Sequence, residues 1–466
     1  MTEPASDPER IRDMLLRQRR FFATGATRDV EFRRERLRDL GRAIDEGGRA
    51  MSEALRADLR KSAAETFLTE IFLVKNEIRT AVRRLRRWAR PRRVRPPLYQ
   101  RPAACEVRPE PYGTALILAP WNYPVQLTLS PLVGAIAAGN CCVVKPSELA
   151  PASSAAIRGV IERAFEPELA AVVEGGADTA RCLLSEGFDR IFYSGGPDVG
   201  RLVMRAAADG PTPVTLELGG KNPCVVDRSA DLAATGRRIA WGKLLNAGQS
   251  CVAPDYALVH REVKDALVAA LADAVRDLYG DDPSRSPDYG RIASQRHFER
   301  LLGLMSQGTV VLGGETDPGD LYIAPTLMER PEPGSALARE EIFGPILPIV
   351  EWGDVEEAIA EIRSRPAPLA LYVFASDRGL ADAVLDAVPS GGACVNDVIS
   401  HMANDALPFG GVGPSGMGAY HGKASFDTFT HYRSVMRKGF ALDLPVRYPP
   451  YEKRRRWLEW LSRLYR

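Results

Sequence analysis

A single cysteine among small and polar residues is the first candidate for covalent chemistry in this chain. Cys251 lies in Asn246-Ala247-Gly248-Gln249-Ser250-Cys251-Val252-Ala253-Pro254, between a predicted helix and the β-type run Tyr256–His260. A loop therefore presents the thiol, and its small neighbours leave the access that a thiolate nucleophile needs. The alternative is an inert buried thiol. We expect that second role for four cysteines in apolar stretches: Cys141, Cys142, Cys182 and Cys394.

Glu217 is the candidate for general base catalysis. It ends a β-type run, Val214–Glu217, and stands between Leu216 and Leu218 ahead of Gly219-Gly220. Leucines on both sides predict a carboxylate shielded from water, and loss of water raises a carboxyl pKa toward that of a useful base. Alternatively, Glu217 is structural and accepts hydrogen bonds from backbone amides of the Gly-Gly turn.

Asn122 is the candidate for stabilising a developing negative charge. It lies in Trp121-Asn122-Tyr123-Pro124, soon after the β-type run Thr114–Leu118. A side-chain amide at this place either stabilises a turn or donates a hydrogen bond to an oxyanion.

Two glycine-rich segments are candidates for phosphate binding. Gly411-Val412-Gly413-Pro414-Ser415-Gly416 fits GxGxxG, but it follows Pro408-Phe409 rather than a strand, so we interpret it as a turn. Ser194-Gly195-Gly196 follows the β-type run Arg190–Tyr193 and precedes a predicted helix, Val199–Ala208. A helix N-terminus reached through glycines directs backbone N–H groups at a pyrophosphate, although a Gly-Gly turn also serves as a plain connection.

The elements that position these residues alternate between strands and helices. Residues 8–90 have the apolar spacing of helices, and from residue 105 short β-type runs alternate with Ala-rich helical stretches. A second alternating block occupies about residues 222–430, with helices predicted near 231–245, 262–279 and 355–363. Such alternation predicts βαβ units, so the fold class is α/β with two doubly wound parallel-sheet domains.

Composition excludes several classes of protein. The 62 basic and 60 acidic residues give a net charge of +2, which predicts no general attraction to nucleic acid. Eight arginines between Arg83 and Pro97 are interpreted as a solvated helix end and an extended connector rather than a nucleic-acid surface. Seven cysteines without metal-ligand spacing predict free thiols in a reducing compartment and no metal site. Without a signal peptide or a long apolar run, we expect a cytoplasmic protein.

These segments together resemble the aldehyde dehydrogenase superfamily, and within it the class 3 enzymes. The resemblance extends from the N-terminal helices to about Pro450. The motifs that carry it are APWNYPVQLTLSPLVGAIAAGNCCVVKPSE, TPVTLELGGKNP, RRIAWGKLLNAGQSCVAPDY, EEIFGPILPIV and LPFGGVGPSGMGAYHGKASF.

The resemblance implies a role for each matching position. Cys251 would be the nucleophile, Glu217 the general base, and the Asn122 amide with the Cys251 backbone N–H the oxyanion hole. The implied cofactor is NAD, with NADP as a second cofactor, and it would be held by Trp121, Lys145, Glu148, Ser194, Gly195, Gly196, Glu341 and Phe343. Lys145 and Glu148 would hold the adenosine ribose, Glu341 would hold the nicotinamide ribose, and Phe343 would pack near the nicotinamide ring. The family usually has a serine where Gly196 stands, so one hydroxyl toward the pyrophosphate is missing.

The resemblance also implies the organisation of the chain. Residues 1–90 and 113–218 would form the dinucleotide-binding domain and residues 219–424 the catalytic domain. Segments 91–112 and 425–445 would form a small bridging unit that joins two subunits into a homodimer. Residues 446–466 form a basic tail, and its apolar residues share one helical face: Trp457, Leu458, Trp460, Leu461, Leu464 and Tyr465. This tail either packs on its own dimer or makes a peripheral contact with an anionic membrane surface.

The expected reaction is oxidation of an aldehyde, aliphatic (fatty) or aromatic, to a carboxylic acid through a thioester on Cys251. Two other classes remain as alternatives. In an acyl-transferring relative, coenzyme A would receive the acyl group, but such an enzyme has no need of the water-activating Glu217. A non-catalytic binding protein on the same fold would have no need of Asn122, Glu217, Cys251 and Glu341 together.

Overall fold

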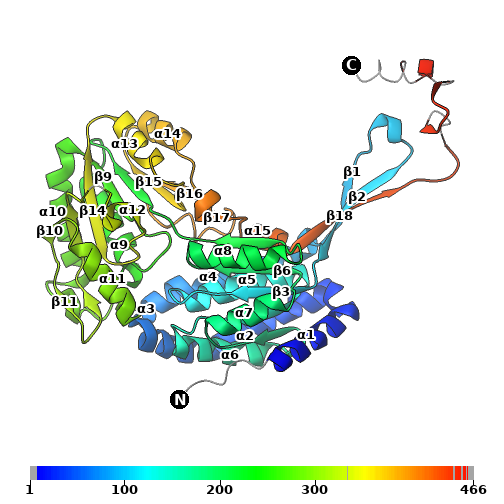
Figure 1. Cartoon of the computed structure of the whole chain (residues 1–466), viewed down its shortest axis with the longest axis horizontal. Coiled ribbons are helices and arrows are strands. Elements are labelled where there is room, and N and C mark those ends of the chain that lie inside the picture. Colours follow the sequence, from blue (N-terminus) through cyan, green and yellow to red (C-terminus); the bar gives the residue numbers. More distant parts are fainter. Residues whose placement is uncertain (1–7, 333, 444–446, 453–454, 458, 460–466) are drawn as a thin grey trace. The chain divides into compact units, whose positions relative to one another are not determined.

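The computed structural model describes residues 8–332, 334–443, 447–452, 455–457 and 459 (Figure 1). They divide into two units, one made of residues 8–88 and 111–431 and the other of residues 89–110 with those from 432 onward. The first unit holds every residue for which a chemical role is predicted.

Long helices open the first unit, as the apolar spacing predicts. On α2, Leu37, Leu40 and Ile44 are fully buried, and the Asp29 side chain caps the helix by accepting hydrogen bonds from the first backbone N–H groups. A short π-helix, Phe67–Ile71, interrupts the path between α3 and α4. The bounds are α1 Pro8–Ala23, α2 Val30–Leu59, α3 Ala63–Thr66 and α4 Phe72–Trp88.

A six-stranded sheet follows, in the order β17-β7-β6-β3-β4-β5. Its strands are parallel except β17, which pairs antiparallel with β7 at the edge. The strands are β3 Thr114–Leu118, β4 Cys141–Lys145, β5 Ala170–Val172, β6 Arg190–Ser194, β7 Val214–Glu217 and β17 Gly416–Met417. The strand order reverses between β3 and β6, and in sheets of this kind ligands bind beyond the carboxyl ends of the strands at that point.

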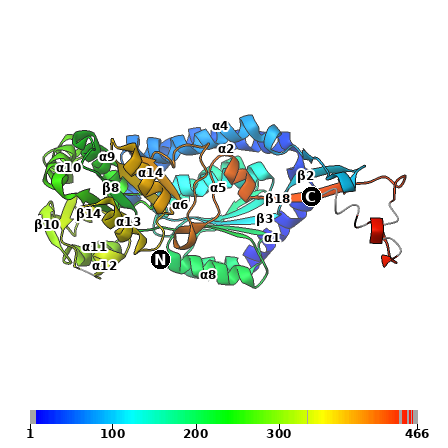
Figure 2. The same ribbon diagram turned by 90° about the horizontal axis from the view of Figure 1, so that it is seen from above.

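Helices cover both faces of this sheet, which makes it doubly wound (Figure 2). On one face, α1, α7 and α8 pack on the strands through a core that includes Leu15, Leu183, Val203, Leu116 and Ile191. On the other face lies α5, every residue of which is buried. The helices are α5 Pro124–Ala138, α6 Pro151–Ala164, α7 Ala177–Ser185 and α8 Pro197–Ala208.

A seven-stranded sheet, in the order β10-β13-β14-β9-β8-β15-β16, is parallel except for its edge strand β10. The predicted α/β fold with two doubly wound sheets is confirmed, with one antiparallel edge strand added to each. The strands are β8 Pro223–Val226, β9 Tyr256–His260, β10 Thr309–Leu312, β13 Thr326–Glu329, β14 Ile346–Trp352, β15 Ala370–Phe374 and β16 Gly392–Val395. The helices are α9 Leu232–Leu244, α10 Lys264–Tyr279, α11 Gln295–Met305, α12 Ala336–Arg339, α13 Val355–Arg363 and α14 Arg378–Ala387.

Three shorter elements complete the first unit. A two-stranded ribbon pairs β11 Thr316–Asp317 with β12 Tyr322–Ile323, and α15 spans Lys423–Thr428. The GxGxxG segment contains a single short 3₁₀ turn, Gly413–Ser415, followed by β17. That segment is therefore a turn, as predicted, and does not open a helix.

The second unit contains a three-stranded sheet in the order β1-β2-β18. The strands are β1 Arg92–Val94, β2 Ala104–Pro111 and β18 Thr430–Arg437. The predicted helix end and extended connector are confirmed: α4 ends at Trp88, and the connector contains the extended strand β1. Its pairing with β2 was not predicted. All three residues of β1 are exposed.

The C-terminal tail is only partly described. Residues 458 and 460–466 lie outside the described residues, so the predicted apolar helical face and its membrane contact stay predictions. Among the helices that the structure describes, none is long and apolar enough to span a bilayer.

Candidate active site

The loop that carries Cys251 begins where α9 ends and is sharply turned. Asn246, Ala247 and Gly248 have successive positive φ angles of 52°, 51° and 77°. A Cβ at Gly248 would overlap the carbonyl oxygen of Gly344, so this turn requires glycine. Left-handed backbone at two residues other than glycine is uncommon and typical of functional loops.

Gln249 ties this loop to the rest of the unit. Its side chain is fully buried, and Nε2 donates to the carbonyls of Asn246 and Arg291, each at 2.9 Å. Its Oε1 accepts from the backbone N–H of Ala293 at 2.9 Å. Because every polar atom of the amide is paired, the backbone on the N-terminal side of Cys251 is held in one place.

The Cys251 thiol is half-buried and lies near two carboxylates. Burial, followed by the charges of Glu341 and Glu217, raises its pKa above the ordinary range, while the backbone N–H groups of Cys251 and Val252 act in the opposite direction. The resting group is therefore the thiol, and its proton must leave when the sulfur attacks.

Glu217 ends β7 at the carboxyl edge of the first sheet, with its side chain buried. Neither carboxylate oxygen has a hydrogen-bond partner among the described residues. Burial alone raises the pKa of this carboxyl well above its ordinary value. The alternative of a structural Glu217 bonded to the Gly-Gly turn is therefore wrong, because no backbone amide of that turn donates to it.

Asn122 follows β3 at the same edge and is buried. Its Nδ2 donates to the carbonyl of Gln249 at 3.1 Å, two residues before Cys251. A primary amide carries two N–H donors, so one remains for a ligand. The Asn122 side chain thus contacts the Cys251 loop, so it does more than stabilise the turn in which it lies.

Glu341 and Phe343 lie in a segment that side chains of neighbouring elements hold in place. Arg300, on α11, donates to the carbonyls of Glu341, at 3.3 Å, and Ile342. The ring Nε2 of His297 lies 2.7 Å from the carbonyl oxygen of Phe343, whose φ is 56°.

The Glu341 carboxylate lies against Gly219, because a Cβ on that glycine would overlap both of its oxygens. Its Oε1 is buried without a partner within the described part of the chain. Burial and the negative charge of Asp255 raise the pKa of Glu341 to about 8, while a hydrogen bond from the Gly220 backbone N–H acts in the opposite direction. A buried carboxyl with a free oxygen fits a ligand hydroxyl, as predicted for the nicotinamide ribose.

Three rings gather beside this segment. Trp121 packs edge-to-face on Phe343 at 5.4 Å and on His297 at 5.8 Å. Burial lowers the pKa of His297 to about 4, so its imidazole is neutral at neutral pH. These rings give the cofactor candidates Trp121 and Phe343 a common apolar surface.

Lys145 and Glu148 lie at the carboxyl end of β4. The Lys145 ammonium is buried and donates to Glu148 Oε2 at 3.0 Å, while the Glu148 side chain is 43% exposed. An exposed carboxylate beside a fixed cation suits a ribose hydroxyl, which can donate to the first and accept from the second.

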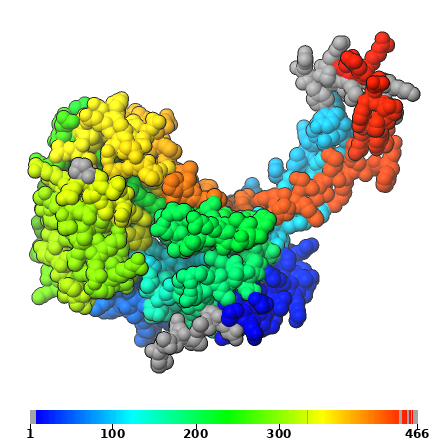
Figure 3. All heavy atoms as spheres, in the orientation of Figure 1, coloured from blue at the N-terminus to red at the C-terminus, as the bar shows by residue number. Residues whose placement is uncertain are grey.

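Ser194, Gly195 and Gly196 connect β6 to the N-terminus of α8, a helix that lies on the face shown in Figure 3 (green), and Gly196 and Pro197 are exposed. Ser194 Oγ is buried and has no hydrogen-bond partner among the residues described. A Cβ on Gly195 would overlap Tyr193 Oη, whereas a Cβ on Gly196 would meet nothing within 4 Å. The orphaned hydroxyl and the open helix N-terminus fit a pyrophosphate.

The predicted residues thus fall into two groups. Cys251, Glu217, Asn122 and Glu341 are linked by contact or charge across the carboxyl ends of the first sheet and the amino ends of the second. Lys145, Glu148 and Ser194–Gly196 line the same carboxyl edge of the first sheet. No hydrogen bond joins this second group to the Cys251 loop in the described structure.

The prediction that four further cysteines are buried is half wrong. Cys141 and Cys142 are buried in β4, but Cys182 and Cys394 are half-buried. Cys182 lies on α7, which covers the sheet with only one face, and Cys394 Sγ lies 3.2 Å from His401 Nδ1. An apolar stretch on an outer element leaves some of its residues exposed.

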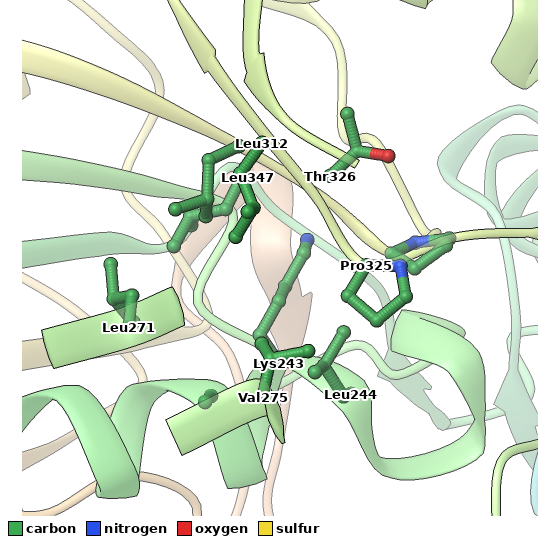
Figure 4. A pocket seen from close by; sticks show the side chains of 11 residues that line it. Lys243, Leu244, Leu271, Val275, Leu312, Pro325, Thr326 and Leu347 are labelled. Atoms are coloured by element: carbon green, nitrogen blue, oxygen red, sulfur yellow. The ribbon is translucent and has the colours of Figure 1, made fainter. Parts of the chain in front are cut away.

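Lys243 on the last turn of α9 is a buried cation that the sequence did not single out (Figure 4). It is 2% exposed, and its Nζ has no hydrogen-bond partner within the described structure. It borders a cavity of about 20 Å³ whose other lining residues are mostly apolar, among them Leu271, Val275, Leu312 and Leu347. Burial lowers the pKa of the amine to about 8.

Several residues that hold the site were also missed: Lys61, Glu70, Asp255, His297 and Arg300. Each contacts residues far along the chain, and a lone charged residue is usually exposed. Asp255 lies in the motif RRIAWGKLLNAGQSCVAPDY, but for the others no periodicity or motif sets them apart from residues of the same types elsewhere in the chain.

The Ser194–Gly196 turn and the unpaired Glu217 carboxylate lie at the carboxyl edge of the first sheet, and the Cys251 loop precedes β9 of the second. Comparison with known proteins identifies the family. The profile described as "Aldehyde dehydrogenase family" matches residues 1–435. The chain belongs to the aldehyde dehydrogenase family.

Individual relatives agree across the whole aldehyde dehydrogenase chain. It is 45% identical over 441 residues to the 4,4'-diaponeurosporen-aldehyde dehydrogenase of Staphylococcus aureus, covering 94% of this chain and 96% of the relative. It is 46% identical over 445 residues to human aldehyde dehydrogenase family 3 member B1, covering 95% of each. The predicted resemblance to class 3 enzymes is confirmed.

Solved structures agree with the fold. The substrate-bound Staphylococcus aureus AldH structure superimposes with a TM-score of 0.94 at 43% identity, covering 97% of this chain and 99% of that one. Aldehyde dehydrogenase structures of the same fold hold NAD⁺. The protein is therefore an enzyme that oxidises aldehydes and uses NAD(P).

Proposed function

We propose that this aldehyde dehydrogenase converts an aliphatic or aromatic aldehyde to the carboxylic acid through a thioester on Cys251. The observation that carries this proposal is Glu217, a buried carboxylate whose two oxygens have no partner within the described structure. Burying a carboxylate without a hydrogen-bond partner destabilises the fold, so its presence calls for a chemical role, and general base catalysis supplies one. It also favours water over coenzyme A as the acyl acceptor.

Acylation begins with Cys251. Since burial raises the pKa of the thiol, the sulfur loses its proton as it adds to the aldehyde carbon, and Glu217 and Glu341 are the nearby carboxylates that can receive it. The new oxyanion accepts hydrogen bonds from Asn122 Nδ2 and the Cys251 backbone N–H. A donor of this kind typically stabilises the transition state by roughly 3–4 kcal/mol.

The nicotinamide cofactor, when bound, supplies the acceptor for the hydride that leaves the tetrahedral carbon. We assign its phosphates to Ser194–Gly196 and its two riboses to Lys145 with Glu148 and to Glu341. Phe343, in edge-to-face contact with Trp121, would pack near the nicotinamide ring.

Deacylation depends on Glu217. The carboxylate takes a proton from a water molecule, and the hydroxide adds to the thioester carbon. The C–S bond then breaks and the carboxylic acid leaves. The proton on Glu217 passes to the departing sulfur, which restores the Cys251 thiol and the Glu217 carboxylate.

The substrate class follows from the surface around the site. Three apolar side chains near Glu70, those of Phe67, Leu68 and Phe72, are 50%, 60% and 44% exposed. Glu70 itself contacts the site, because it accepts hydrogen bonds from the backbone N–H groups that follow Asn122 and Tyr123. Exposed apolar side chains there suit an apolar aldehyde. The name of the Staphylococcus aureus relative specifies 4,4'-diaponeurosporen-aldehyde, so that compound belongs in the test.

The test is a panel of aliphatic aldehydes of rising chain length, aromatic aldehydes and 4,4'-diaponeurosporen-aldehyde, followed by NADH absorbance. We expect kcat/KM to rise with apolar surface and Cys251→Ala to abolish oxidation with every substrate, while NAD⁺ affinity stays within about twofold. Activity of Cys251→Ala within tenfold of the wild type would remove Cys251 from the mechanism.

Glu148 also sets an expected cofactor preference for NAD⁺. Its carboxylate accepts a hydrogen bond from a ribose 2′-hydroxyl but repels a 2′-phosphate, and Lys145 offsets only part of that repulsion. Kinetics with both cofactors test this, and a strong preference for NADP⁺ would contradict the assignment of Glu148.

A further inference from the structure

A buried ion pair lies next to the oxyanion candidate. Lys61 Nζ lies 2.6 Å from Glu70 Oε1, and both side chains are fully buried. Removing two charges from water is costly, and a buried pair rarely adds stability over apolar residues of the same volume. The pair therefore needs an explanation other than the stability of the fold.

Lys61 contacts the residues that carry the oxyanion donor. Its Nζ donates to the backbone carbonyl of Asn122 at 2.9 Å and lies 3.8 Å from the centre of the Tyr123 ring. The same carbonyl accepts a second hydrogen bond, at 2.8 Å, from Nδ2 of Asn246 in the Cys251 loop. Lys61 and Asn246 thus together hold the peptide unit of Asn122.

Glu70 holds the next turn of the chain. Its Oε2 accepts from the backbone N–H groups of Val125 and Gln126, at 2.9 and 3.0 Å, in the first turn of α5. These N–H groups have no partner within the helix, and a carboxylate there is favoured by the helix dipole. Glu70 lies in the π-helix Phe67–Ile71, a distortion frequent at functional sites.

We propose that Lys61 and Glu70 form a positioning pair that holds the Asn122 amide at the place where the oxyanion develops. The inference rests on the proposed role of Asn122. One N–H of the Asn122 amide donates to the Gln249 carbonyl, which leaves the other for the oxyanion. Where that second N–H points depends on the position of the Asn122 backbone, and Lys61 and Glu70 hold this backbone. Neither member of the pair touches the substrate: both act through Asn122.

The double variant Lys61→Met/Glu70→Gln tests the proposal. It removes both charges of the pair together, so neither is left without its partner. The buried Glu65 nearby, whose pKa burial raises to about 7 against the charge of Lys61, becomes easier to keep neutral when Lys61 is lost. We expect the pre-steady-state burst of NADH to slow at least about tenfold, with aldehyde KM unchanged within about twofold, because misplaced catalytic groups lower the rate of the chemical step. Lys61→Arg keeps a cation within reach of both acceptors and should restore most of the rate.

Arg33→Met is the matched structural control. Arg33 is a buried cation that donates to the carbonyl of Ala137, at 3.1 Å, near the other end of α5. Its loss should lower thermal stability and leave the burst rate per active site unchanged. If Arg33→Met slows the burst as much as the double variant does, the effect is a general one of weakening α5 and the proposal fails.

A double-mutant cycle with Asn122→Ala separates the two levels of the argument. Asn122→Ala alone should slow acylation by roughly 10²–10³-fold, and adding Lys61→Met/Glu70→Gln should cost no more than about twofold further. Three outcomes would overturn the positioning role. The effects of the two changes could be fully additive, the double variant could keep the wild-type burst rate, or Lys61→Arg could be as slow as the double variant. An Asn122→Ala enzyme with the wild-type rate would instead overturn the oxyanion assignment, and the pair's role with it.

Discussion

Burial at single residues sets the chemistry of this active site. It raises the pKa of Glu217 and of the Cys251 thiol in the same direction, toward the protonated form, but the consequences differ. A carboxylate with a raised pKa is a stronger base, whereas a thiol with a raised pKa needs help to ionise. In the proposed mechanism, both effects make the proton transfers between these residues and Glu341 decisive.

Deacylation should therefore increase with pH. Only ionised Glu217 accepts a proton from water, and because its pKa is raised, the ionised fraction grows above the ordinary carboxyl range. Under conditions where hydrolysis limits turnover, kcat should rise with pH, and Glu217→Gln should lower it at least about 10²-fold and abolish the dependence. The same pH profile in the variant would show that another group titrates.

Lys243 has no role in the proposed reaction, so it shows what the burial of a charge costs in stability alone. Its pKa is lowered to about 8, so the folded state carries the full cost of the buried cation below pH 8. The cost declines from pH 8 toward the unfolded-state pKa near 10.5, because there the unfolded state binds more protons. Lys243→Met, which suits the apolar lining, should raise the free energy of unfolding at pH 7 by roughly 1–3 kcal/mol.

Denaturant unfolding at pH 7 and pH 10 checks this expectation. The advantage of Lys243→Met over the wild type should shrink at the higher pH. Lys423→Met removes an exposed lysine paired with Asp427 and should change little at either pH. If Lys243→Met lowers the free energy of unfolding, the ammonium makes interactions that stabilise the fold by more than its burial costs.

At the scale of elements, the sequence predicted what its local patterns contain. The strands Thr114–Leu118, Val214–Glu217 and Tyr256–His260 and the helix 355–363 have the predicted bounds, because their apolar periodicity and flanking turns are local signals. The pairing of β1 with β2 and the antiparallel edges β10 and β17 were not predicted, since pairing depends on residues distant in the chain.

The candidate site followed the same division. The residues of the loops after β3, β6 and β7 were found because each loop follows a recognisable strand and carries a motif. The supporting side chains, such as Glu70, His297 and Arg300 on helices and Lys61 in the connection between α2 and α3, gave no local signal. Charged residues in helices are ordinary, and only the tertiary structure shows which of them are buried.

The turn before α8 offers a prediction at this scale. Gly196 is the N-cap of α8, with φ of −71°, and a Cβ there would meet nothing within 4 Å. Gly196→Ser should therefore be tolerated, cap the helix at a gain of a few tenths of a kcal/mol, and tighten NAD⁺ binding by supplying a hydroxyl. Fluorescence titration with NAD⁺ measures the affinity.

Gly195→Ser is the matched variant one residue earlier. Its Cβ would overlap Tyr193 Oη, so the turn must shift, and we expect weaker NAD⁺ binding. If the two serine variants bind NAD⁺ equally, the phosphates do not lie at this turn.

At the scale of the whole molecule, the second unit is too exposed to be explained by the chain alone. Its sheet has β18 as an edge strand, and exposed apolar side chains include Leu98, Tyr99, Met436 and Phe440. A long edge strand with apolar side chains invites pairing with another chain. This supports the prediction that the unit joins two subunits.

Light scattering should accordingly give twice the 51.0 kDa chain mass at micromolar concentration. Met436→Glu on β18 should shift the protein toward the monomer by adding charge to the interface. Val310→Glu adds the same charge to an exposed position of another edge strand, β10, and should leave the dimer intact. A wild-type monomer would refute the prediction.

The central claim, a thioester on Cys251 that Glu217 hydrolyses, is tested most directly by the intact mass of one variant. Glu217→Gln incubated with NAD⁺ and an aldehyde should produce a stoichiometric burst of NADH and then gain the mass of one acyl group. Peptide mapping should place that group on Cys251, and Glu217→Gln/Cys251→Ala should gain nothing. An unmodified Cys251 in Glu217→Gln after the burst would contradict the account.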